Sequence, residues 1–174
     1  MSENHKLDTD TQVFFYEQDF YVLSNFSAFR IKVWDHNFDT SEHAYHWAKF
    51  AKTDPVVATC IRLASSAHAA FKLAQNYPER VRPDWKDVRV EIMREILRAK
   101  ASQHEYVFRK LLATGDRELI EDSWRDSFWG WGPNRDGLNV LGRLWMELRS
   151  EFREAVQRAK ETNGIEGTEG EIRQ

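Results

Sequence analysis

The residues best suited to chemistry stand together between Thr40 and Phe50, a short stretch that holds a carboxylate, two imidazoles, an amine and several aromatic rings. Its alanines and the spacing of its large side chains predict a helix, with Thr40 or Ser41 as the N-terminal cap. Residues at i, i+3, i+4 and i+7 of a helix share one face, and four reactive side chains have this spacing: Glu42, Tyr45, His46 and Lys49. This face could form the wall of a cleft, or it could be an exposed helix surface with a solvated Glu–Lys stripe. The spacing of the residues does not distinguish these two alternatives.

A second informative stretch covers residues 123–139, where three tryptophans and a phenylalanine alternate with three glycines and a proline. Glycine and proline at this density exclude a long helix, and the aromatic content argues against disorder. A loop of this length in a compact domain is usually functional. Asn139 at its end is expected to cap the last helix.

Composition places the chain among soluble globular proteins, with 174 residues, 41% hydrophobic and 30% charged. No apolar run reaches the roughly 20 residues that span a bilayer, and the polar N-terminus lacks the apolar centre of a signal peptide. Cys60 is the single cysteine, which excludes an internal disulfide and fits a reducing compartment; we expect it to be buried and inert. We therefore expect a cytoplasmic protein, or a nuclear one in a eukaryote, without a membrane partner.

The net charge of −3 argues against broad electrostatic binding of nucleic acid. It does not exclude a local pocket for one or two phosphates.

The elements that must position these residues are mostly helices, so we predict an α+β fold: a mainly helical single domain with a small N-terminal antiparallel sheet. Residues 13–16 and 29–34 are predicted strands, with a packed loop between them and a turn at 35–37. Helix signals begin at Asp54-Pro55, Ser65-Ser66, Asp84 and His104, and a helical stripe follows Asn139. We expect a folded domain over 12–160, a disordered N-terminus over 1–11 and a disordered acidic tail over 161–174.

Several kinds of site are not supported by any motif. There is no H-E-x-x-H or cysteine pair for zinc, no G-x-S-x-G for a serine hydrolase, and no G-x-G-x-x-G or P-loop pattern for nucleotides; we expect neither metal nor cofactor. What remains is carboxylates beside aromatics and cations. Carboxylates stabilise an oxocarbenium-like sugar and activate water, tryptophan stacks on a flat base, and Lys49, Arg82 and Arg89 can hold phosphate. The residues alone indicate a pocket for a small aromatic and anionic ligand.

Four motifs in the chain match the sequence pattern of one family. They are Leu23-Ser24-Asn25-Phe26, a loop; residues 40–50, which match T-S-E-H-x-x-Q-x-x-K-F; and Arg82 to Trp85, which matches R-x-x-W before a long helix. The fourth covers residues 126–149, which match D-x-[FY]-W-G-x-G…G-x-N-x-L-G-x-L-x-M-x-x-R. With these motifs the chain resembles the NADAR family, the YbiA-like N-glycosidases, over about residues 13–152. The chain departs from the family pattern at His46 (Gln), Arg89 (commonly Lys) and Trp145 (Leu), and we expect the last to be a packing change.

The resemblance implies hydrolysis of the bond between a base and a ribose that carries phosphate or ADP. It implies one of two substrates: ADP-ribosyl-guanine in nucleic acid, or ribosylaminopyrimidine phosphate intermediates of riboflavin synthesis. The partners expected from it are a nucleotide or ADP-ribose small molecule and, as a second class, ADP-ribosylated DNA or RNA. Glu42 would be the principal catalytic carboxylate and Asp126 its partner. Residues expected to bind substrate are Ser24, Asn25, Phe26, Tyr45, Arg82, Trp85, Arg89, Trp129, Gly130 and Asn139.

Two questions stay open at the level of sequence. Lys49 could attack C1′ of the ribose as an amine or hold phosphate as a cation, and burial near another cation would favour the amine. The chain could also be a non-catalytic module that binds NAD or ADP-ribose. Retention of Glu42 together with Asp126 favours the enzyme.

Overall fold

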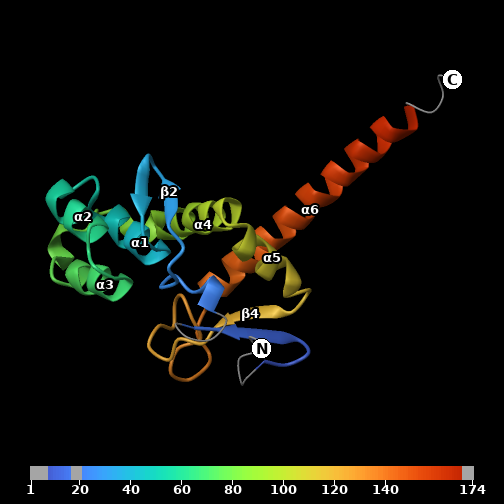
Figure 1. Ribbon diagram of the computed structural model, residues 1–174. Coiled ribbons are helices and arrows are strands. Elements are labelled where there is room, and N and C mark those ends of the chain that lie inside the picture. Colours follow the sequence, from blue (N-terminus) through green and yellow to red (C-terminus); the bar gives the residue numbers. More distant parts are fainter. Residues whose placement is uncertain (1–7, 17–20, 170–174) are drawn as a thin grey trace.

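Helix α1 (Ser41–Phe50) packs against α2, α3 and α4 in the computed structural model, which describes residues 8–16 and 21–169 (Figure 1). Thr40 precedes it in an extended conformation and its hydroxyl oxygen accepts a hydrogen bond from His43 N, which is the predicted cap. All but two of its ten residues are buried. The α+β class and the mainly helical content predicted from the sequence are confirmed.

Two small sheets replace the single N-terminal sheet that we expected. β2 (Ile31–Val33) and β3 (His36–Phe38) form an antiparallel hairpin, whereas β1 (Gln12–Phe15) pairs in parallel with β4 (Glu118–Glu121). The hairpin turn lies at Trp34-Asp35 instead of residues 35–37, and both turn residues have positive φ, as a two-residue turn of type I′ requires. The β1–β4 pairing joins segments about a hundred residues apart, and local alternation carries no information about such a partner.

The remaining helices are α2 (Pro55–Arg62), α3 (Ala67–Gln75), α4 (Trp85–Gln103), α5 (Glu105–Ala113) and α6 (Val140–Glu169), with 3-10 turns η1 (Tyr21–Leu23) and η2 (Pro78–Arg80). Asp54 and Ser66 cap α2 and α3 through their side chains, as their positions in the sequence predict. Asp84 precedes α4 but makes no side-chain cap, because its carboxylate accepts two hydrogen bonds from the Arg82 guanidinium.

The main core lies between α1, α4, α6 and the strands, and includes Phe15, Phe38, Ile96, Leu111 and the fully buried Trp145. A second cluster, formed by Phe50, Val57, Ala58, Ile61, Ala70 and Ala74, joins α2 and α3 to α1. Because α2 turns Val57, Ala58 and Ile61 inward, Cys60 is exposed, and our expectation of a buried thiol is wrong.

Both predicted ends of the domain differ from the structure in part. Residues 8–11 lead into β1, with the Asp8 carboxylate accepting a hydrogen bond from Phe14 N; residues 1–7 lie outside the described part. Helix α6 continues to Glu169 and projects away from the other elements (Figure 1), so residues 161–169 are helical instead of a disordered tail. Residues 170–174 are outside the described range. No helix in the described part of the chain combines the length and apolar character needed to cross a membrane.

Candidate active site

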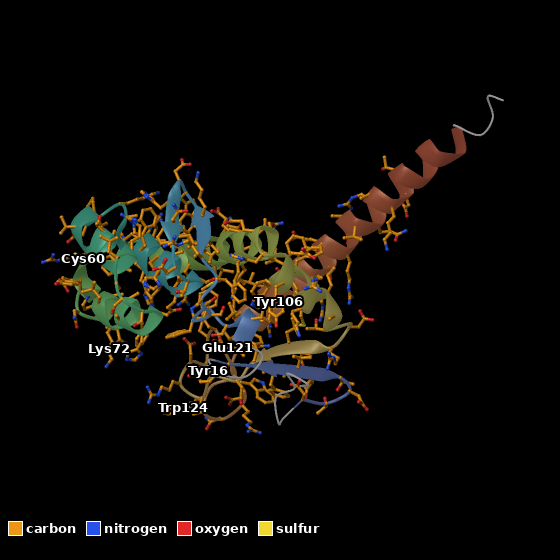
Figure 2. All side chains as sticks on the ribbon, in the orientation of Figure 1. Tyr16, Cys60, Lys72, Tyr106, Glu121 and Trp124 are labelled. Atoms are coloured by element: carbon orange, nitrogen blue, oxygen red, sulfur yellow. The ribbon has the colours of Figure 1, made fainter. Side chains whose placement is uncertain are left out.

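A cavity of about 700 Å³ opens between the inner face of α1, helices α3 and α4, and the loops that carry Ser24 and Trp129. In Figure 2, Tyr16 and Glu121 mark its strand side and Lys72 its α3 side. Its wall combines residues from segments far apart in the chain: Tyr16, Ser24, Asn25, Phe26, Glu42, Tyr45, His46, Lys49, His68, Phe71, Lys72, Gln75, Trp85, Arg89, Met93, Glu121, Ser123, Arg125, Asp126, Phe128 and Trp129.

The reactive face of α1 forms one wall of this cavity, which is lined by Glu42, Tyr45, His46 and Lys49. Glu42 is only 7% exposed, and its Oε1 lies 2.7 Å from His46 Nε2. Burial lowers the pKa of His46, although Glu42 opposes this. Because a carboxylate oxygen only accepts, Nε2–H of the imidazole is the donor in this hydrogen bond. The face is a cleft wall, and the surface-stripe alternative is wrong.

Lys49 Nζ lies between two aromatic rings, 5.0 Å from the centroid of Tyr45 and 5.6 Å from that of Trp85. Within the described residues this amine makes no hydrogen bond or ion pair. Burial lowers its pKa to about 8; Glu42 and Asp126 oppose the shift and Arg89 adds to it. A lysine with this pKa presents a substantial fraction of neutral amine near physiological pH.

Aromatic rings make up the wall beside Lys49. Tyr45 meets Trp129 edge to face, with centroids 5.5 Å apart, and lies 5.0 Å from Trp85. Trp129 Nε1 donates to the Tyr45 hydroxyl oxygen at 3.1 Å, and burial raises the pKa of Tyr45. The Tyr45 proton therefore stays in place and can be donated to a ligand, while the rings offer flat surfaces for a base.

Three polar atoms of the cavity residues are buried without a partner among the described residues, and His46 Nδ1 is one of them. Arg89 Nε is one donor of a guanidinium whose carbon lies 3.5 Å from the centroid of the Phe128 ring. Asn25 Oδ1 is an acceptor, while Asn25 Nδ2 contacts the Met93 sulfur. Buried polar groups are rarely left unpaired without a reason. A ligand that carries both a donor and an anionic acceptor would satisfy them.

Asp126 organises the tryptophan loop. Its Oδ1 accepts hydrogen bonds from Phe128 N and Trp129 N, both at 2.8 Å. These bonds fix the turn that presents the Trp129 ring to Tyr45. Asp126 lines the same cavity as Glu42, so the structure brings the two carboxylates to one site.

Three residues expected to bind substrate lie elsewhere. Arg82 forms its pair with Asp84, and its backbone N–H donates to Lys49 O. Gly130 is buried where a Cβ would meet Glu121 O at 2.8 Å. Asn139 accepts a hydrogen bond from Glu121 N and donates to Leu119 O, so its side chain fastens the loop to β4. The other seven predicted binding residues line the cavity.

The α3 wall was not predicted from the sequence. His68, Phe71, Lys72 and Gln75 line the cavity, and the Phe71 ring lies 5.6 Å from that of His46. Their spacing of three to four residues indicates one helix face, but nothing local says that this face meets α1. Among residues 8–16 and 21–169, no three His, Cys, Asp or Glu side chains gather as a metal site.

Comparisons with known proteins show what this chain is similar to. The model of the NADAR domain matches residues 14–153. The N-glycosidase YbiA of Escherichia coli is 38% identical over 145 residues, which cover 82% of this chain and 89% of that protein. A riboflavin biosynthesis protein of Vibrio vulnificus is 41% identical over 144 residues, 82% of this chain but only 39% of its own length. The NMR structure of Escherichia coli YbiA superposes with a TM-score of 0.77 at 34% identity, covering 91% of this chain and 96% of that one.

Proposed function

Because this chain belongs to the NADAR domain family, we propose that it is an N-glycosidase, a hydrolase that separates a base from the ribose of a phosphorylated or ADP-ribosylated substrate. The observation that carries the proposal is the enclosure of the Glu42 carboxylate and the Lys49 amine in one aromatic-lined cavity. Relatives named N-glycosidase and riboflavin biosynthesis protein support this reaction class. The site provides for each part of such a substrate: rings for the base, carboxylates for the sugar and Arg89 for phosphate.

In the proposed reaction, Glu42 acts on the sugar. Cleavage of the bond to the base builds positive charge at C1′ and the ring oxygen, and a buried carboxylate stabilises that charge more strongly than water does. The bond from His46 Nε2 holds one carboxylate oxygen, Oε1, in a fixed position. Preorganisation of this kind avoids reorientation during the reaction.

Lys49 is proposed to be the nucleophile. Its neutral amine forms a bond to C1′ as the bond to the base breaks, and the leaving base takes one proton from Nζ. As the ribose ring opens, the ring oxygen takes a proton from solvent and becomes a hydroxyl, and the nitrogen lone pair forms an iminium between C1′ and Nζ. Water then adds to the iminium at C1′, the bond from C1′ to Nζ breaks, and the sugar is released with the amine neutral and one proton returned to solvent. The pKa of about 8 for Lys49 supports this role over that of a phosphate anchor.

Asp126 offers a test of whether its charge or its hydrogen bonds matter. Asp126→Asn keeps an oxygen that can accept from Phe128 N and Trp129 N, while Asp126→Ala removes it. If Asp126 assists Glu42 by charge, both variants should lose about tenfold or more in kcat for base release. If only Asp126→Ala loses activity, the carboxylate serves the loop, and its role as a partner of Glu42 is wrong.

The substrate is tested by comparing two compounds that share the ribosyl bond. A ribosylaminopyrimidine phosphate and an oligonucleotide with an ADP-ribosylated guanine are each incubated with the protein, and free base is measured by chromatography. We expect release from at least one of them, and the faster reaction identifies the substrate class. Calorimetry with ADP-ribose runs in parallel. Binding of ADP-ribose without release of base from either compound would instead establish the non-catalytic module.

A further inference from the structure

Lys100 is a buried amine that the proposed reaction does not use. It lies on α4 with 0% of its surface exposed and does not line the cavity. Its Nζ donates to Ser24 O at 2.8 Å and to Ser27 Oγ at 2.6 Å. The rings of Phe29 and Trp145 lie 5.3 and 5.9 Å away, and no carboxylate among the described residues pairs with it.

This placement carries a cost that packing alone does not explain. An ammonium removed from water without an anion is unfavourable, and burial lowers the pKa of Lys100 to about 7. Methionine would fill a similar volume without that cost. Unlike methionine, the lysine amine donates two hydrogen bonds to the turn between Ser24 and Ser27.

That turn connects Lys100 to the cavity. Ser27 Oγ also donates to Ser24 O at 2.7 Å, so Nζ and the two oxygens form a closed set of hydrogen bonds. Within the turn, Asn25 O accepts from Glu42 N at 3.1 Å. One short turn therefore separates Lys100 from the backbone of Glu42, and Asn25 places its unpaired Oδ1 beside the cavity.

We propose that Lys100 is a positioning residue, which fixes the Ser24–Ser27 turn so that the turn holds Glu42 and Asn25 in place. Trp145 on α6 also holds this region, because its Nε1 donates a hydrogen bond to Leu23 O at 3.0 Å. The tryptophan therefore does more than change the packing, which is all that we expected of it. The effect on catalysis rests on the proposed function. The link between Lys100 and the Glu42 backbone does not.

Lys100→Met tests the link, with Lys86→Met on the exposed surface of the same helix as control. Amide hydrogen exchange is measured by NMR, with urea unfolding to report overall stability. Without the ammonium the turn opens more readily, so exchange at the amides of Glu42 and Ser27 should become about tenfold faster or more. The amide of Ile61 in α2 should be unaffected, and base release should fall for Lys100→Met only.

A second variant keeps the test decisive if Lys100→Met does not fold. Ser27→Ala removes one acceptor of Nζ and leaves the charge in place, and it should give a smaller but equally local increase in exchange. Unchanged exchange at Glu42 in a folded variant, or a uniform increase over all amides, would overturn the inference. Exchange needs no substrate. Absence of base release by the wild-type protein would therefore count against the proposed function, while exchange alone would decide the role of Lys100.

Discussion

Replacing Glu42 with glutamine should lower kcat for base release by about 100- to 1000-fold, with little change in KM. Gln keeps an oxygen that can accept from His46 Nε2, whose distance to Glu42 Oε1 is 2.7 Å, so the shape of the site is retained. What disappears is the negative charge, which the transition state needs and the bound substrate does not. Initial rates over a range of substrate concentrations separate kcat from KM.

A matched control is Glu105→Gln, which removes a carboxylate whose side chain is 85% exposed on α5. It should leave both constants within about twofold of wild type, as surface charges rarely matter at a distance. Base release near the wild-type rate by Glu42→Gln would show that the carboxylate does not carry the chemistry. Parallel urea unfolding checks that the variant is folded.

Replacing Lys49 by methionine or by arginine should abolish most base release, with kcat falling by about 100-fold or more in both. Methionine keeps the apolar stem between Tyr45 and Trp85, and arginine keeps a positive charge. If the amine is the nucleophile, neither can replace it. Retained activity in Lys49→Arg alone would make Lys49 a phosphate anchor instead. Lys52→Met, an exposed lysine just after α1, is the control.

The pH dependence of the wild-type protein gives the same distinction without a mutation. The pKa of Lys49 is lowered to about 8, so the neutral amine increases about tenfold per pH unit below that value and levels off above it. A nucleophile therefore predicts that kcat rises from pH 6 to about 8 and then stays level. An anchor predicts the opposite, a loss of binding as the charge is removed above pH 8.

Borohydride gives direct evidence for the covalent step. Reduction of the iminium during turnover should attach the sugar to Lys49, as a mass increase that peptide mapping assigns to that residue. Lys49→Met should not acquire it. Normal turnover by the wild-type protein with no trapped adduct would remove the covalent mechanism and leave direct attack by water.

The local parts of this protein could be predicted from its sequence. The 3.6-residue spacing of Glu42, Tyr45, His46 and Lys49 placed them on one helix face, and α1 begins at its predicted cap. Asp54 and Ser66 likewise begin the helices that their types predict. Helix caps and hydrophobic periodicity depend only on residues within one or two helical turns of each other. They can therefore be recognised in the sequence without knowledge of the tertiary structure. The resemblance to a family came from four motifs, and the cavity brings residues of all four together.

Long-range neighbours could not be predicted in this way. The parallel pairing of β1 with β4, the α3 wall of the cavity, and the hydrogen bonds from Lys100 to the Ser24–Ser27 turn all join segments distant in sequence. The same holds for Arg82 and Asn139, whose motifs suggested ligand contacts but whose side chains bind Asp84 and β4. The chain's local pattern thus determined which residues share a helix face and where helices begin. Tertiary packing decided which of these faces meet, because burial, pKa and hydrogen-bond partners depend on segments that only folding brings together.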